Sequence, residues 1–340
     1  MKSSHLFRIL RVKMKKRILT IIQLLISIGL LTLVILKYNI SLFDNIRSLS
    51  NPNFLFISLG ITIIFIPLSA AFRWKILLKY AGLNENIFTL IKVNFISIFW
   101  GIFLPSSDGF AAVRIYQIEK RHPQNPGKSG STVVVEKLFG FLLLCFIGII
   151  GTLIISDLQN IFRLRFILLS LTLLVLLVLI FAANNRIYNF LISKFENIFS
   201  KIKIFSYLQK LHKSLTKFPY LRTSYKVFPI ILLVQMLTIL NVFILFRAMN
   251  IQKPLIFFIA IIPIIQIISL IPITISGFGV RESAFVYFFG LLGIDPSISF
   301  TVSIFNFLIL TGVPAFMGGM ISISRQIKKT NLLRKLPKFE

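Results

Sequence analysis

Two hydrophobic stretches of the sequence combine glycine, an acidic residue and an arginine. One runs from Leu104 to Arg114, LPSSDGFAAVR, and the other from Ile271 to Phe285, IPITISGFGVRESAF. A charged side chain at the centre of a lipid bilayer costs about 3 kcal/mol on insertion scales, so it normally pairs or faces a wet cavity. Irregular backbone at that depth also needs protein or water to satisfy its polar groups. Both stretches are therefore candidate binding sites.

The ionisable residues at or near membrane depth are the best candidates for binding a charged ligand. The chain has 10 acidic residues, and three of them fall in this zone, each with a basic residue nearby in the sequence. Glycines allow tight backbone turns, and the freed N–H groups beside an arginine could hold a phosphate head group. The carboxylates could pair with the arginines when the site is empty, or carry a proton. The candidate substrate-binding residues are Asp108, Gly109, Arg114, Glu136, Lys137, Gly277, Gly279, Arg281 and Glu282.

Other kinds of chemistry receive less support from the sequence. A purely structural set of ion pairs, holding two helical hairpins together, is the alternative for the residues above. The single cysteine, Cys145, lies in an apolar run, and the three histidines have no partner at metal-ligand spacing. The sequence has no acid cluster typical of metal-dependent transferases, no GxxxxGK[ST] and no GxSxG. We therefore expect no catalytic residue, metal or cofactor, and no ATP-driven transport unless a partner supplies the ATPase.

The composition is that of a polytopic helical membrane protein. Of the 340 residues, 56% are hydrophobic, the mean hydropathy is +0.88, and several apolar runs are long enough to cross a bilayer. We expect one integral membrane domain over residues 1–340, with all-α structure. The 38 Lys and Arg residues fall mainly between the apolar runs, so they indicate topology rather than contacts with nucleic acid.

Six apolar runs are predicted to span the membrane. The first follows a basic N-terminal segment and is typical of an uncleaved signal anchor; translation starting at Met1 or at Met14 would both fit this pattern. Arg73 and Trp74 follow the second run, where they fit a simple membrane-boundary anchor. The predicted spans are Ile18–Leu36, Asn53–Phe72, Ser131–Ile155, Phe166–Ala183, Phe228–Phe246 and Ile298–Ile323.

Two further apolar segments, Ile87–Glu119 and Pro254–Leu292, are interrupted and are predicted to be re-entrant hairpins. After the break in the first, Phe110–Glu119 has about ten residues, which rise about 15 Å, half of a hydrocarbon core of about 30 Å. The hairpin interpretation also keeps the basic linker 184–227 in the cytoplasm, as the positive-inside rule requires. The same rule places both termini in the cytoplasm.

The order of these segments predicts an inverted repeat. Residues 18–155 and residues 166–323 each contain two spans, a hairpin and a further span in that order, and the two halves have opposite orientation in the membrane. Transporters that bind substrate between their repeats have this arrangement. Chance placement of apolar runs is the alternative. Within the linker, apolar residues at helical spacing oppose the lysines, which predicts an amphipathic helix on the inner leaflet, either binding anionic lipid or serving as a topology anchor.

Four segments of the chain resemble the membrane region of lysylphosphatidylglycerol synthases and their stand-alone, flippase-like relatives. They are FRWKILLKYAG, FWGIFLPSSDGFAAVRIYQ, STVVVEKLFGFLLL and IPITISGFGVRESAF. The sequence departs from this family where Ser106-Ser107-Asp108-Gly109 replaces the usual Gly-Gly-Asp, and where Glu136-Lys137 replaces an acid-arginine pair. The resemblance implies lipid handling at the cytoplasmic membrane, of aminoacylated phospholipid in some relatives and of polyprenyl or hopanoid lipids in others.

The resemblance also shapes the functional expectation. The synthases carry a large soluble domain after the membrane region, and this chain ends 17 residues beyond Ile323. We therefore expect a translocator for an anionic or zwitterionic lipid head group, working between the two hairpins. The alternative is a membrane transferase, or an accessory subunit of a membrane enzyme, that acts on a polyprenyl-phosphate-linked sugar.

Overall fold

The computed structural model describes residues 21–41, 45, 47, 49–104, 109–154, 161–184, 205–271, 273–274 and 277–334, with the backbone alone at 154, 161 and 326–334. This part of the chain consists of helices and their connections, without a strand. The all-α class predicted from the sequence is confirmed.

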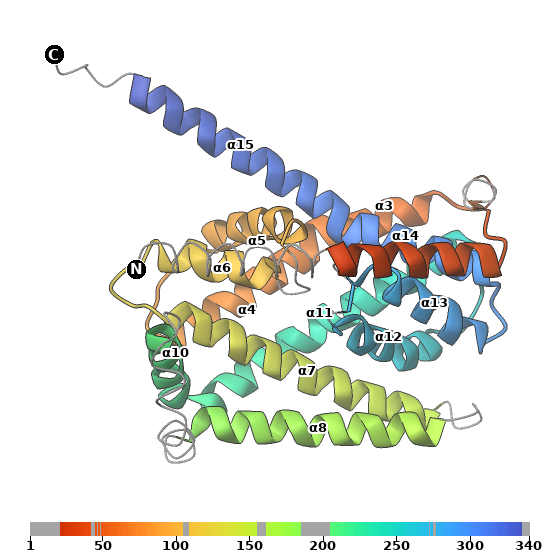
Figure 1. Cartoon of the computed structure of the whole chain (residues 1–340), viewed down its shortest axis with the longest axis horizontal. Helices are drawn as coiled ribbons and strands as arrows, with labels where there is room; N and C mark the ends of the chain where they lie inside the picture. The colour runs from red at the N-terminus through yellow and green to blue at the C-terminus, as the bar shows by residue number, and fades with distance from the viewer. Residues whose placement is uncertain are drawn as a thin grey trace, which may run out of the picture.

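Five helices of the described part are long and apolar enough to cross a membrane, and most of them run lengthwise through the molecule (Figure 1). A shorter apolar helix, Ile21–Lys37, begins where the described part begins and matches the first predicted span. The five are α3–η1–α4 (Asn53–Gly60, Ile61–Phe65, Ile66–Tyr80), α7 (Lys128–Ile154), α8 (Ile161–Ala183), α11 (Tyr220–Ala248) and α14–η3–α15 (Pro296–Phe307, Leu308–Gly312, Val313–Arg334).

Two of these long helices contain a π-helical turn just before a proline. The turn η1 precedes Pro67 and the turn η3 precedes Pro314. Proline has no N–H and its ring clashes with the preceding turn, so a local widening to π-helix lets the helix continue. Both helices therefore remain long enough to span.

The predicted first hairpin consists of α5 (Ile87–Ile102) and α6 (Gly109–Glu119), which pack against each other. Glycines allow this close packing. A Cβ atom added to Gly101 would lie 2.6 Å from the backbone nitrogen of Phe110, and one added to Gly109 would lie 2.6 Å from the carbonyl oxygen of Gly101.

The two helices of hairpin one return to the end of the bundle from which they start. Glu85, just before α5, forms an ion pair of 3.4 Å with Arg121, just after α6, and its other oxygen lies 3.1 Å from His122. The geometry of a hairpin is thus as predicted, while its depth in a bilayer stays a prediction.

The predicted second hairpin consists of α12 (Leu255–Ser269) and α13 (Val280–Gly290). Gly277 and Gly279 have φ of +77° and +84°, a region that favours glycine. The rings of Phe258 and Phe289 lie 5.4 Å apart, so the start of α12 lies near the end of α13. Hairpin two therefore also returns to the end from which it starts.

Each hairpin belongs to its own hydrophobic cluster. The cluster around hairpin two includes Phe246, Phe258 and Phe289, all fully buried. The cluster around hairpin one includes Trp74 and Leu90. Each cluster also contains residues of the other predicted half, Cys145 around hairpin two and Val227 and Ile231 around hairpin one, so the division into two repeats stays a prediction.

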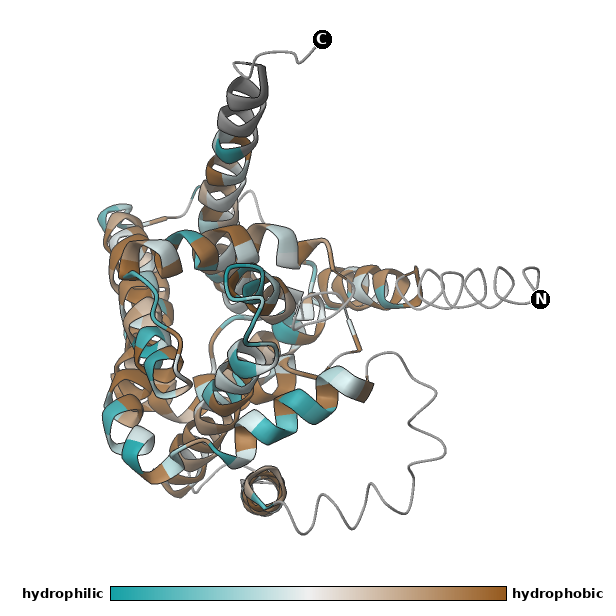
Figure 2. Cartoon of the chain, turned by 90° about the vertical axis from the view of Figure 1, so that its left-hand side faces the viewer, coloured by the Kyte–Doolittle hydropathy of each residue, from teal (hydrophilic) through white to brown (hydrophobic). Residues whose placement is uncertain are grey.

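One helix of the basic linker, α10 (Phe205–Thr216), is described, and it lies across the ends of α7 and α8 (Figure 1). Its apolar face packs on the protein, because His212 and Leu215 are each only 6% exposed and Leu211 contacts α7 at Gly130. Leu208 of the same helix is 44% exposed, and the predicted position of α10 on the inner leaflet stays a prediction. The part of the predicted amphipathic helix at 185–204 lies outside the described residues. Figure 2 views the bundle from this end, which we call the α10 end, and most of the helical ribbon has the colour of hydrophobic residues.

Candidate functional site

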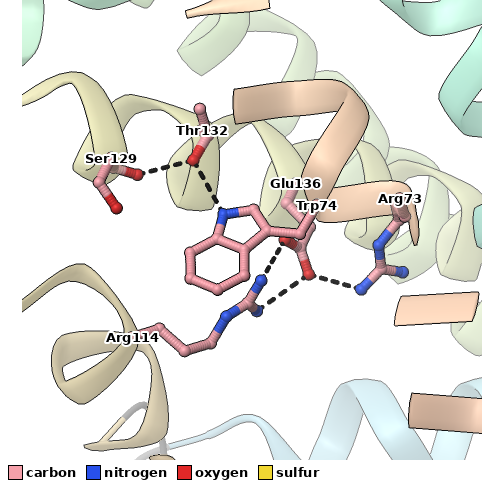
Figure 3. Close-up of polar contacts among 6 residues, drawn as sticks. All are labelled: Arg73, Trp74, Arg114, Ser129, Thr132 and Glu136. Carbon is pink, nitrogen blue, oxygen red and sulfur yellow. Dashed lines mark hydrogen bonds and ion pairs between the residues drawn. The ribbon is translucent and has the colours of Figure 1, made fainter. Parts of the chain in front are cut away.

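Glu136 of α7 is the centre of a buried ionic cluster. Its two carboxylate oxygens accept hydrogen bonds of 3.1 and 2.9 Å from the guanidinium of Arg114 on α6. One of them also accepts a hydrogen bond from Arg73 on α4 (Figure 3). Arg114 is 4% exposed and Glu136 is 7% exposed. The cluster therefore fastens hairpin one to two spanning helices.

An aromatic side chain completes this cluster. The guanidinium carbon of Arg114 lies 3.9 Å from the ring centroid of Trp74, a cation–π contact. Trp74 is fully buried, and its indole N–H donates a hydrogen bond of 3.1 Å to Thr132 (Figure 3). The Thr132 hydroxyl in turn donates to the carbonyl oxygen of Ser129. The prediction that Arg73 and Trp74 form a simple membrane-boundary anchor is wrong.

The charges in this cluster do not balance among the described residues. Two guanidiniums share the single carboxylate of Glu136, and the Nε atoms of both arginines are buried without a hydrogen-bond partner.

Lys137, the residue after Glu136, points to a different neighbour: its Nζ lies 5.6 Å from the ring centroid of Phe110. Adjacent helical residues do not face each other. Asp108, predicted to belong to this site, lies outside the described residues.

The second predicted pair caps the start of α13. Glu282 is fully buried, and its carboxylate accepts a hydrogen bond of 2.6 Å from the backbone N–H of Gly279. A carboxylate in the first turn also favours the positive end of the helix dipole. The guanidinium of Arg281 forms an ion pair with the same carboxylate. Glu282 thus links the helix cap to Arg281.

Arg281 lies in an aromatic setting. Its guanidinium carbon is 4.7 Å from the ring centroid of Phe307 and 5.4 Å from that of Phe278. These two rings contact each other edge to face. Because 14% of the Arg281 side chain is exposed, it is less enclosed than Glu282.

A cavity of about 520 Å³ lies between the tips of the two hairpins, and we call it the central cavity. Hairpin one lines it with Gly101, Ile102 and Phe110, and hairpin two with Ser269, Leu270, Arg281 and Phe285. The remaining wall comes from α7, α11 and the α14–η3 segment. Polar side chains in the lining are Thr238, Asn306 and Thr311 from this wall and Gln266 from α12 of hairpin two.

The predicted site residues separate into two groups. Arg281 lines the central cavity, with Glu282 and Gly279 directly behind it. Arg114, Glu136 and Lys137 do not line it. Arg114 lies 5.9 Å from the ring centroid of Phe110, whose side chain forms part of the cavity wall. In the described part of the chain, no three His, Cys, Asp or Glu side chains are grouped to hold a metal ion.

The long apolar helices, the two interrupted hairpins and the buried ionic clusters define an integral, multi-pass membrane protein. The sequence matches the model of the family described as the lysylphosphatidylglycerol synthase TM region over residues 20–318, and the chain belongs to this family. The match covers both hairpins and both ionic clusters. The chain is also similar to the UPF0104 membrane protein MJ1595 of Methanocaldococcus jannaschii, with 24% identity over 330 residues, 93% of this chain and 97% of that protein.

Proposed function

We propose that this protein translocates a lipid, binding the head group of a phospholipid or polyprenyl-type lipid and moving it between the two leaflets of the cytoplasmic membrane. The observation that carries the proposal is the central cavity between the hairpin tips, with Arg281 in its wall. The family description supports a lipid substrate, because lysylphosphatidylglycerol is a phospholipid.

The lining of the central cavity suits a polar head group. Polar side chains at membrane depth normally face cavities or one another. Gln235 donates a hydrogen bond of 2.8 Å to Gln266, and Asn241 donates one of 3.3 Å to Asn306. These bonds hold two amides in place at the wall. Hydroxyl, amine or phosphate groups of a lipid would find fixed hydrogen-bond partners there.

Arg281 supplies the charge in this proposal. A guanidinium can bind two oxygens of a phosphate through parallel N–H groups, which an ammonium cannot do. Glu282 engages the Nε and one Nη of Arg281 and also caps α13 at Gly279. A phosphate that competes for Arg281 would therefore disturb the cap of α13. Head-group binding is coupled in this way to the position of hairpin two.

We assign Arg114 and Glu136 the role of positioning hairpin one. Their ion pair, shared with Arg73, holds hairpin one against α4 and α7. Phe110, next to Arg114, then keeps its place in the cavity wall. This assignment follows the structural alternative that the sequence left open for these residues.

The loops predicted to be cytoplasmic gather at the α10 end of the bundle. Residues of the α4–α5 connection, the α6–α7 connection and α10 together line a pocket with four lysines. Such clustering of basic residues supports a cytoplasmic position for the α10 end. The linker and both termini, which are rich in basic residues, belong on the same side in this proposal. The pocket residues are Tyr80, Ala81, Gly82, Gln124, Asn125, Pro126, Lys128, Ser131, Lys210, Lys213, Ser214, Lys217 and Phe218.

Reconstitution into vesicles tests the proposal. Vesicles containing the purified protein and a fluorescent lipid are treated with a membrane-impermeant reductant, which reports how fast label moves between leaflets. We expect faster movement than in protein-free vesicles for a phosphate-bearing class among labelled phosphatidylglycerol, phosphatidylethanolamine and polyprenyl phosphate.

Single substitutions test whether translocation depends on the central cavity. Arg281→Ala should reduce the rate to the protein-free level, and Arg281→Lys should restore it only in part. Arg247→Ala is the matched control, because Arg247 also lies over a phenylalanine ring, 5.0 Å from the centroid of Phe243, but does not line the central cavity. Wild-type rates in Arg281→Ala would remove the cavity from the mechanism. Failure of the wild-type protein with every lipid class would refute translocation and favour the accessory-subunit or transferase alternative.

A further inference from the structure

A second concave site lies between hairpin one and α15, and we call it the lateral groove. Its volume is about 900 Å³. The lining residues are Val93, Ile96, Trp100, Phe103 and Leu104 from α5 and the hairpin tip, Val113, Tyr116, Gln117, Lys120 and Arg121 from α6 and its end, and Ser322 and Arg325 from α15. Figure 1 shows α15 leaving the bundle at an angle.

Hairpin one separates the lateral groove from the central cavity. Ile98, Gly101 and Ile102 of α5 line the central cavity, whereas Ile96 and Trp100 line the lateral groove. Residues three or four apart share a face of a helix, so these are two faces of one helix. In α6, Phe110 at the start of the helix lines the cavity, and Val113, Tyr116 and Gln117 further along it line the groove.

The lateral groove changes from apolar to cationic along its length. Near the hairpin tip it is lined by large exposed side chains, including Trp100 and Phe103, which are 44% and 68% exposed. At the end of α6 it is lined by Lys120 and Arg121, and Arg325 of α15 reaches toward the same end, where it contacts Gln117. The helix rises about 15 Å from Phe110 to Lys120, which is the depth of one leaflet.

Two of the three cations in the groove have no carboxylate partner in the described part of the chain. Arg121 forms an ion pair with Glu85. Lys120 lies 6.0 Å from the ring centroid of Tyr116, and Arg325 donates a long hydrogen bond of 3.5 Å to the side-chain oxygen of Gln117. No acidic side chain of the described residues lines the groove. The groove therefore favours an anionic ligand at this end and an apolar one at the other.

We infer that the lateral groove binds a phospholipid of the leaflet at the α10 end. Its phosphate lies between Lys120 and Arg325, and an acyl chain follows Trp100 and Phe103 toward the hairpin tip. A head group with net negative charge is preferred, because the two cations lack a carboxylate partner. The lateral groove can bind a phospholipid whether or not the protein translocates one. Only the further step, that the bound lipid is the translocated lipid, rests on the proposed function.

Tryptophan quenching by brominated lipid tests this binding site directly. The chain has two tryptophans; Trp100 lines the groove, and Trp74 is fully buried in the ionic cluster. The purified full chain is titrated in detergent micelles with phosphatidylglycerol or phosphatidylcholine brominated on the acyl chains. Bromine quenches only the tryptophan that it approaches closely, so the signal reports occupancy near Trp100.

We expect phosphatidylglycerol to quench at a lower mole fraction than phosphatidylcholine. Lys120→Gln and Arg325→Gln should each raise the mole fraction needed for phosphatidylglycerol about fivefold, the effect of about 1 kcal/mol per basic residue, and leave phosphatidylcholine unchanged. Trp100→Phe should leave an emission that brominated lipid does not quench. Lys213→Gln, which changes a lysine of the α10 pocket, is the matched control and should behave as the wild type.

Several results would overturn the inference. They are equal quenching by the two lipids, a preference that survives in the Lys120→Gln/Arg325→Gln double variant, and quenching of Trp74 in the Trp100→Phe variant. Full reversal of quenching by glycerol phosphate would show that a free phosphate compound occupies the site in place of a lipid. Binding is measured here without transport, so the two proposals fail separately. Selective quenching by phosphatidylglycerol without translocation of any lipid by the wild-type protein refutes the proposed function alone, and translocation without selective quenching refutes this inference alone.

Discussion

Replacing Glu136 with glutamine should destabilise the protein strongly. Glutamine has nearly the same volume, but it leaves the guanidiniums of Arg73 and Arg114 without a negative partner among the described residues. Removing one member of a buried ion pair costs about 3–5 kcal/mol, whereas an exposed pair contributes about 0–1 kcal/mol. Because only 5% of the Arg114 side chain and 8% of the Glu136 side chain are exposed, the larger range applies. We expect a loss of about 3 kcal/mol.

The assay is thermal unfolding in detergent micelles, followed through the emission of Trp74, which stacks on Arg114. For a soluble chain of a few hundred residues, each kcal/mol lowers the Tm by about 2–4 °C, so we expect a decrease of about 6 °C or more. Arg121→Gln is the matched control. It breaks the ion pair with Glu85, but Arg121 has 48% of its side chain exposed. Its Tm should fall by about 4 °C at most.

The double variant Arg114→Gln/Glu136→Gln distinguishes a charge effect from a packing effect. Because it removes both partners, it should be more stable than the sum of the two single changes predicts, by about 1 kcal/mol or more. Additive losses would refute the argument that the charges are coupled. A Tm of Glu136→Gln within the range of the Arg121→Gln control would also refute it.

Three further changes follow from the fold. Gly279→Ala should impair accumulation of folded protein, measured by size-exclusion chromatography. The φ of Gly279 is +84°, and an added Cβ would meet helix Ile21–Lys37. Gly140→Ala is the control and should have no such effect, because the space around Gly140 is open. Gln252 is an exposed residue of the α11–α12 connection, at the far end of α11 from α10. In intact cells of a strain that makes the chain without its native cysteine, an impermeant thiol reagent should label Gln252→Cys but not Lys213→Cys; the opposite pattern would place the α10 end outside. Burial and a neighbouring carboxylate raise the pKa of Tyr207. Stability should therefore decline above about pH 10, where the unfolded tyrosine ionises, and Tyr207→Phe should lessen that decline; equal slopes in a pH series of thermal unfolding would argue against it.

The spanning helices and the hairpins were predictable because they depend on local properties of the chain. Uncharged runs of sufficient length indicate spans, and the ten residues after the break at Gly109 are too few to cross a bilayer. A tight turn was likewise expected at Gly277 and Gly279, and both have a positive φ. Each of these conclusions needs only the residues of one segment.

The pairing of side chains was not predictable, because it depends on packing between distant segments. Arg73 lies 63 positions before Glu136, and no local pattern indicated that the two would meet. Lys137 follows Glu136 directly, but helix geometry turns it toward Phe110. The basic face of α10 was visible in the sequence, whereas its docking surface on α7 was not.

The division of the candidate residues between two places also required the structure. Arg114 and Arg281 both follow a helix break, so the sequence treated them alike. In the structure Arg281 lines the central cavity, and Arg114 is turned toward Glu136, away from the cavity lining. Two arginines that look equivalent in the sequence therefore lie in different surroundings.

Blocking the central cavity tests the proposed path of the lipid most directly. Ser269 lines the cavity at the end of α12, and Ser170 is an exposed residue of α8. In a chain without the native cysteine, Ser269→Cys and Ser170→Cys are modified with a bulky maleimide before reconstitution, and modification is verified by mass spectrometry. We predict that modified Ser269→Cys moves labelled lipid no faster than protein-free vesicles, whereas its unmodified form and modified Ser170→Cys retain the wild-type rate. An unchanged rate in fully modified Ser269→Cys would contradict transport through this cavity.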